Sequence, residues 1–232
     1  MSVSLTERRQ QNLSAARPDT RSVTPSTRSF AQAIDRQRAA VERIPLLSLA
    51  RPEVAKVASA LDSAEVAALA VEVDHPAADL PRMAELARLI SVPLLRMDLL
   101  LEEFQIYESR LYGADAVLLV AAQLPDGALA RLCNAARSTH LTACVLCATA
   151  ADVARAAGSR ADVIALAPAA LLDQALVAAV PARALVLVVP AAADADAVAA
   201  TLLGRADALI DRAIAFAADP AAAFCAALAE EE

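Results

Sequence analysis

The segment Arg96–Met97–Asp98 places a cation and a carboxylate on either side of a methionine, at the end of an apolar run. A charged pair at such a point can bind a polar ligand, and the end of a strand is where an enzyme would keep its working groups. A methionine thioether has no proton to donate and no charge with which to polarise a carbonyl. These residue types therefore allow ligand binding but leave the central position without acid–base chemistry.

Other polar residues also follow apolar runs, and Glu72 stands out among them. A carboxylate among apolar side chains is costly without a cation, and we expect Arg51 or Arg96 to supply one. Ordinary ion pairs at the edge of a sheet are the simpler interpretation of all these charges. The candidate ligand-binding residues are Arg51, Glu72, Arg96, Asp98, Asp211 and Arg212, with Asp74, His75, Gln123 and Thr149 at similar positions.

The spacing of Cys144 and Cys147 is that of a metal or redox pair, but its context favours buried thiols. Both lie in the apolar run LTACVLCA, and residues three apart on a strand point to opposite faces. No second pair or nearby histidine completes four zinc ligands. The two histidines, His75 and His140, are expected in a loop and at a helix end. We therefore expect no metal, no cofactor and no histidine-based catalytic triad.

Composition narrows the classes of function. The 232 residues are 58% hydrophobic and 3% aromatic, and the formal net charge of -7 argues against binding to a nucleic-acid backbone. No apolar run approaches the roughly 18 residues that cross a bilayer. The N-terminus, MSVSLTERRQQ, lacks the apolar segment of a signal peptide, so we expect a cytoplasmic protein.

The order of elements predicts an α/β fold. Residues 1–28 resemble a flexible polar and basic tail, and residues 29–232 a single domain that opens with a covering helix carrying Phe30, Ile34, Val41 and Ile44. Eight apolar runs alternate with helical segments, which favours a (β/α)8 TIM barrel over an open doubly wound sheet. The runs are 44–50, 66–74, 92–99, 114–122, 141–148, 161–168, 184–190 and 206–211.

The middle of the chain resembles a known family. The segment SVPLLRMDLLLEEFQIYESRLYGADAVLLVAAQL is similar to the PVLRKDF, YQIYEAR and GADAVLLI motifs of indole-3-glycerol phosphate synthases. A weaker likeness continues through CVLCATAADV to RADALIDRAIAFAADP, so that most of residues 29–230 is covered. The resemblance implies a barrel of tryptophan biosynthesis, a lyase that closes an indole ring with loss of water and carbon dioxide.

The resemblance also implies catalytic positions, and this chain departs from them. The general-acid lysine falls on Met97, the strand-five glutamate on Leu146, and the strand-six asparagine and following arginine on or beside Ala167 and Ala169. The Glu-x-Lys pair of strand one falls either on Ser48 and Ala50 or on Leu49 and Arg51. Arginine is no substitute for a lysine acid because it holds its proton too tightly.

The phosphate site of the family also looks lost. Barrels usually bind phosphate with glycine-bearing loops after strands seven and eight. None of the four glycines directly follows the runs at 184–190 and 206–211, where Pro190, Ala191 and Asp211 occur instead. The segment from Arg51 to Glu65 is also too short for a long substrate-covering loop before the first helix.

Two functions remain open. The first is a pseudoenzyme that acts by protein binding, scaffolding or self-association, with no nucleic acid or membrane partner. Its basic tail, with Arg8, Arg9, Arg17, Arg21 and Arg28, would suit an acidic partner, although an inert leader explains it equally well. The second is an enzyme: a divergent synthase, or a barrel repurposed for another small polar ligand.

Overall fold

In the computed structural model, eight parallel strands close into a barrel in chain order, each hydrogen-bonded to the next and β8 to β1. The structure describes residues 7, 19, 23–35, 41–167, 170, 173–189 and 206–229. The strands are β1 (Glu42–Ser48), β2 (Leu69–Glu72), β3 (Leu94–Met97), β4 (Ala116–Val120), β5 (Thr142–Cys147), β6 (Val163–Leu166), β7 (Leu185–Val188) and β8 (Ala208–Asp211).

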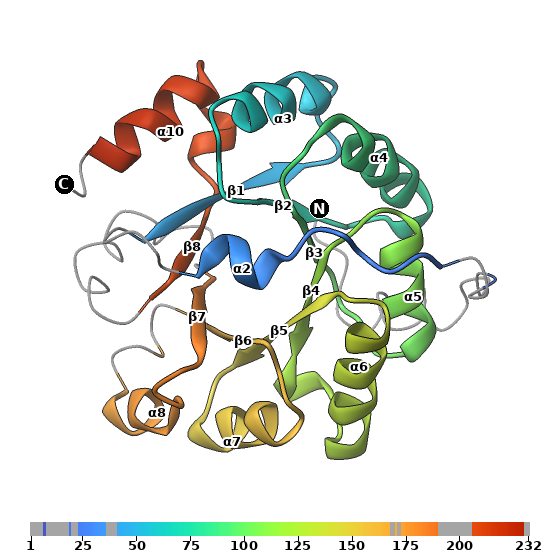
Figure 1. Cartoon of the computed structure of the whole chain (residues 1–232), viewed down its shortest axis with the longest axis vertical. Helices are drawn as coiled ribbons and strands as arrows, with labels where there is room; N and C mark the ends of the chain where they lie inside the picture. Colours follow the sequence, from blue (N-terminus) through green and yellow to red (C-terminus); the bar gives the residue numbers. More distant parts are fainter. Residues whose placement is uncertain are drawn as a thin grey trace.

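Helices surround the barrel, and one short helix lies across its centre (Figure 1). The described α-helices are α2 (Phe30–Ile34), α3 (Val54–Ser63), α4 (Pro76–Leu89), α5 (Glu103–Leu111), α6 (Asp126–Ser138), α7 (Ala150–Gly158), α8 (Gln174–Ala179) and α10 (Pro220–Ala229). Two 3-10 turns, η2 (Ala121–Gln123) and η4 (Ile214–Phe216), follow β4 and β8. The predicted (β/α)8 barrel is confirmed.

The covering helix is shorter than its sequence pattern predicts. Phe30 and Ile34 belong to α2, but Val41 directly precedes β1 and Ile44 lies within it. The prediction of one helix through all four residues was wrong. The first two residues belong to the helix and the last two to the strand that follows, and the spacing of apolar residues did not distinguish the two elements. Phe30 and Ile34 are fully buried, and the Ala31 N–H donates to Thr142 Oγ1 at the start of β5, so α2 closes the N-terminal end of the barrel.

Alternation along the strands separates two apolar cores. Inward-facing residues such as Leu46, Ala70 and Leu95 form the interior of the barrel together with Phe30 and Ile34. Outward-facing residues of the same strands pack against the surrounding helices in a larger cluster. This alternation decides which side chains reach the C-terminal mouth of the barrel.

Three strands are preceded by the dipeptide Ala-Asp, and the aspartate of each dipeptide hydrogen-bonds to the backbone of the preceding strand. The carboxylates of Asp115, Asp162 and Asp207 accept hydrogen bonds from the N–H groups of Leu94, Ala143 and Val186, at 3.0, 2.8 and 2.7 Å. The pairs precede or begin β4, β6 and β8, and their partners lie at or near the start of β3, β5 and β7. A side chain thus extends the backbone ladder at the N-terminal end of the barrel.

Asp115 also holds the segment that leads into α2. Its carboxylate accepts from Ser26 Oγ and pairs with Arg28 at 2.7 Å and with Arg110 at 2.8 Å. The Ser26 N–H donates to the Thr139 carbonyl oxygen at 2.9 Å. Residues 23–28, which the sequence analysis assigns to the tail, therefore lie against the barrel; the rest of that predicted tail is described only at positions 7 and 19.

Gly113 is required by both its conformation and its surroundings. Its φ is +91°, in the left-handed region, and a Cβ atom there would lie 2.4 Å from the Cβ of Ala87 on α4. We expect Gly113→Ala to lower the free energy of unfolding by about 2 kcal/mol or more, measured by urea denaturation.

Gly158 provides the matched control. It ends α7, and a Cβ atom there would meet no atom within 4 Å. Gly158→Ala should leave stability unchanged or raise it by about 0.5 kcal/mol, because alanine restricts the unfolded chain. Equal destabilisation by the two substitutions would contradict the assigned role of Gly113.

Candidate site at the barrel mouth

Eight inward-facing side chains, one from each strand, line the C-terminal mouth. Each is the last inward-facing residue within its strand or the residue directly after that strand. Met97, Leu146 and Val189 pack against the interior cluster, and the two-residue period of a strand places the others on the same side. All eight residues are half-buried. In the described part of the chain, these side chains therefore occupy the mouth but remain partly accessible to solvent. The residues are Ser48, Glu72, Met97, Val120, Leu146, Ala167, Val189 and Arg212.

Glu72 and Arg212 supply the only charges in this set, and they bind each other. Arg212 donates to the two carboxylate oxygens of Glu72 at 3.1 and 3.3 Å, which joins β2 to the end of β8 across β1. The side chain of Glu72 is 39% exposed and that of Arg212 is 34% exposed, so this bidentate pair faces the opening. The expectation that Arg51 or Arg96 would accompany Glu72 was wrong.

Arg51 and Asp211 stabilise the turn after β8 instead. Arg51 donates to the Ala215 carbonyl oxygen at 2.7 Å, and its guanidinium lies 4.8 Å from the centroid of the Phe216 ring. Asp211 is buried, pairs with Arg43 at 3.0 Å and accepts hydrogen bonds from the N–H groups of Ala213 and Ile214. Both side chains hold η4 in place.

Arg96 and Asp98 lie outside the barrel, between β3 and α5. Arg96 is fully buried and donates to Asp98 at 2.6 Å, to Glu108 at 3.2 Å and to Ser109 at 3.1 Å. The side chain of Asp98 is also inaccessible to solvent. Neighbouring positions on a strand point to opposite faces, so Met97 faces the interior while Arg96 faces the helix.

The other polar candidates act mainly at the helix starts. The backbone N–H groups of Asp74 and His75 donate to Asp79 in the first turn of α4, and Thr149 caps α7 by accepting from the Asp152 N–H. His75 and His140 are both exposed. Gln123 lies at the end of η2, which follows β4.

The structure also places the positions that the family resemblance singles out. Ser48 faces inward and Leu49 packs in the outer cluster, so the register with Ser48 and Ala50 is the one directed at the mouth. Leu146 and Met97 both line the mouth. Lys56, the only lysine in the sequence, is exposed on α3. Ala169, Pro190 and Ala191, also named above, lie outside the described residues.

The cysteine pair divides between the two cores. Cys144 belongs to the interior cluster and Cys147 to the outer one, as their spacing predicts. Burial raises the pKa of Cys133 to about 11 and that of Cys147 to about 12, and it raises the pKa of Cys144 further still. Among the described residues, no group of three or more histidine, cysteine or acidic side chains is placed to hold a metal ion.

These environments predict selective thiol chemistry. Only Cys225, exposed on α10, should react with iodoacetamide at pH 8 within the folded protein, because thiolates are the reactive species. Mass spectrometry of peptides should find one alkylated cysteine in the native protein and four after denaturation in urea. Early alkylation of Cys144 or Cys147 would contradict the burial described here.

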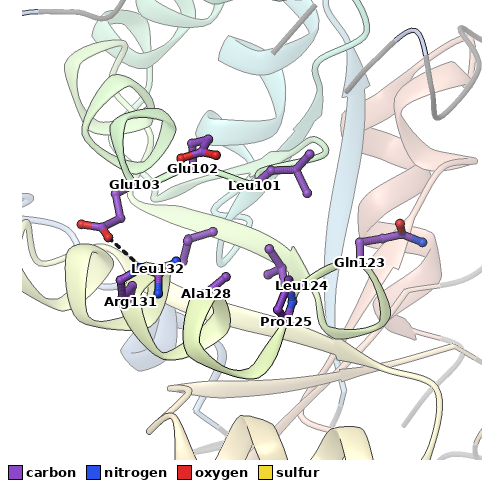
Figure 2. A pocket seen from close by; sticks show the side chains of 9 residues that line it. All are labelled: Leu101, Glu102, Glu103, Gln123, Leu124, Pro125, Ala128, Arg131 and Leu132. Atoms are coloured by element: carbon purple, nitrogen blue, oxygen red, sulfur yellow. Dashed lines mark ion pairs between the residues drawn. The ribbon is translucent and has the colours of Figure 1, made fainter. Parts of the chain in front are cut away.

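Sequence reasoning missed a cleft between α5 and α6, outside the ring of inward-facing residues (Figure 2). Its volume is about 400 Å³, and it is bordered by Glu102 and Glu103 on one side and by Ala128, Arg131 and Leu132 on the other. Nothing in the sequence showed that the starts of these two helices would separate at this point.

A closed (β/α)8 barrel with its polar pair at the C-terminal ends of the strands has the architecture of TIM-barrel enzymes and their relatives. The family model for indole-3-glycerol phosphate synthase matches residues 3–171, and the chain belongs to this family. The matched range ends after β6, so β7, β8 and Arg212 lie beyond it. The described chain contains no helix long and apolar enough to span a bilayer.

Curated relatives match over shorter stretches. The chain is 32% identical over 132 residues to an indole-3-glycerol phosphate synthase of Chlorobium phaeovibrioides, covering 52% of this chain and 51% of the relative. It is 41% identical over 91 residues to one from Neisseria gonorrhoeae, covering 38% and 35% of the two chains. The one from Rhodococcus opacus is 33% identical over 128 residues, covering 55% and 48%. The matches thus span about a third to a half of these relatives.

Proposed function

We propose that this chain is a non-catalytic member of the indole-3-glycerol phosphate synthase family that acts by binding another protein. The observation that supports this proposal is the composition of the mouth. Of the eight inward-facing residues at the strand ends, five are apolar, one is a serine, and the only two charges neutralise each other.

The residues at the mouth lack a suitable proton donor. The guanidinium of Arg212 is a hydrogen-bond donor and is not suited to serve as a general acid. Both carboxylate oxygens of Glu72 accept hydrogen bonds from Arg212, so this carboxylate acts as an acceptor at the mouth. The chain's one lysine lies on the outer surface of α3, so no lysine can serve as the general acid that the family resemblance implies.

The alternative is a divergent synthase or a barrel that acts on another small polar ligand. The observation in its favour is that Glu72 and Arg212 are both about one-third exposed and face the opening of the barrel. A ligand with its own carboxylate and hydroxyl groups would be able to replace one side of this pair. The alternative therefore requires binding that depends on these two residues.

Calorimetric titration separates the two. We expect the purified protein to bind neither carboxyphenylamino-deoxyribulose phosphate nor inorganic phosphate with a Kd below about 1 mM. The matched variant is Arg212→Met, which removes the cation and retains an apolar stem. Tight binding by the native protein that is lost in Arg212→Met would overturn the proposal and establish the mouth as a ligand site.

A further inference from the structure

The C-terminal end of the barrel exposes an aromatic ring next to the ends of β8 and β1. Phe216, in η4, is 58% exposed and is one of three large apolar side chains with high exposure in the described chain. Because the strands are parallel, the segments that follow β8 and β1 lie at the same end of the barrel as the mouth. Around the barrel, α10, α3 and α4 flank this sector (Figure 1).

Arg51 holds its guanidinium over this ring, 4.8 Å from the ring centroid. It donates to the Ala215 carbonyl oxygen at 2.7 Å, and no carboxylate pairs with it among the described residues. An arginine presents five N–H donors in a planar fork, so the fork of Arg51 keeps donors for another acceptor. Since two contacts already orient the fork, pairing with a carboxylate costs little further conformational entropy.

A second arginine reaches the same loop. Arg82, exposed on α4, donates to the carbonyl oxygen of Leu49, two residues before Arg51, at 2.9 Å. This acceptor is neutral, and within the described ranges no carboxylate pairs with Arg82, whereas Arg212 is already paired with Glu72. Two guanidinium groups near the end of β1 therefore lack a counter-charge, although acidic residues outnumber basic ones, 28 to 21, in the chain.

We propose that Phe216, Arg51 and Arg82 form a docking surface for an acidic segment of a partner protein. A glutamate or aspartate of the partner pairs with the two arginines, and a neighbouring apolar side chain covers the open part of the Phe216 ring. This inference rests on the proposed function as a binding protein and names its docking surface and the charge of its partner. Charge complementarity is the argument, because unpaired guanidinium groups favour carboxylates, and arginine and aromatic side chains are enriched at interfaces.

Fluorescence anisotropy with a fluorescein-labelled peptide of alternating glutamate and leucine tests the proposal. We expect this acidic peptide to bind, and a peptide with lysine in place of glutamate not to bind. Arg82→Glu, which reverses one charge, and Phe216→Ser, which removes the ring, should each weaken binding about tenfold or more. Both side chains are exposed, so neither substitution should prevent folding.

Two matched controls make the same kinds of change elsewhere. Arg88→Glu reverses an exposed charge in the last turn of α4, and Leu111→Ser removes an exposed apolar side chain from α5. Neither should change binding by more than about twofold in physiological salt, where exposed charges act over about 8 Å. Equal weakening by a control and its test variant would overturn the proposal, as would no binding of the acidic peptide.

Other occupants of this surface would give different results. Equally tight binding of an oligoglutamate, or of a single-stranded oligonucleotide, would show that charge alone is recognised and would contradict the proposal. Self-association in analytical ultracentrifugation that is lost in Phe216→Ser would identify a second copy of the chain as the occupant, which would also contradict it. Turnover in a synthase assay would refute the proposed function while leaving the peptide result intact, so the two failures are distinguishable.

Discussion

Replacing Arg96 with methionine is expected to lower the free energy of unfolding by about 3 to 5 kcal/mol. The substitution leaves the carboxylates of Asp98 and Glu108 without their shared cation, where their side chains are 0% and 11% exposed. Urea denaturation monitored by circular dichroism measures this loss. Methionine occupies a similar volume, so the effect reports the missing charge more than a cavity.

Arg131→Met is the control for this substitution. It removes an arginine from the exposed pair with Glu103, and stability should change by less than about 1 kcal/mol. If the two variants were equally stable, the buried position of Arg96 between β3 and α5 would be contradicted.

Asp115→Ala should lower the free energy of unfolding by about 2 to 4 kcal/mol, because it removes the shared acceptor of Arg28, Arg110, Ser26 Oγ and the Leu94 N–H. Hydrogen exchange should also show faster exchange at the Ser26 amide, since the segment before α2 loses its main anchor.

Asp162→Ala tests whether the anchoring role is specific to Asp115. Asp162 makes the same contact to a strand N–H, at Ala143, but its side chain is exposed and no ion pair to it is found in the described chain. We expect a loss of about 1 kcal/mol and unchanged exchange at Ser26. Accelerated exchange at Ser26 in both variants would show that the segment is held by overall stability and not by Asp115.

The fold was predictable because the sequence repeats one simple pattern. Apolar runs that are buried on both faces occur eight times with helices between them. Seven of these runs contain a whole strand of the barrel, and β1 begins two residues before its run. The length of α2 was not predictable, because Val41 and Ile44 continue an apolar spacing that helices and strands share. The anchoring of residues 23–28 also escaped prediction, since it depends on Asp115, which lies some 90 positions further along the chain.

The candidate site was predictable in part. Glu72 and Arg212 were both recognised as residues at strand ends, but their pairing depends on how β2 and β8 flank β1 in the closed barrel. Arg96 and Asp98 were placed at the mouth because sequence position alone does not fix which face a side chain takes. The structure resolves this through Met97, which packs inside and so directs its neighbours outward.

The cleft between α5 and α6 had no recognisable sequence pattern. Its apolar surface comes from Leu124, Ala128 and Leu132, which an observer would assign to an ordinary helix interface. The cleft arises because Glu102 and Glu103 lie apart from the start of α6 (Figure 2). Such a gap is a property of packing between elements, and residue types do not determine it.

The central claim, that the mouth of this barrel no longer performs the family's reaction, is tested most directly by a turnover assay. The protein would be incubated with carboxyphenylamino-deoxyribulose phosphate while formation of indole-glycerol phosphate is followed by fluorescence, beside the variants Glu72→Gln and Arg212→Met. The proposal predicts a rate equal to the no-enzyme blank for all three proteins. Turnover by the native protein that disappears in either variant would contradict it.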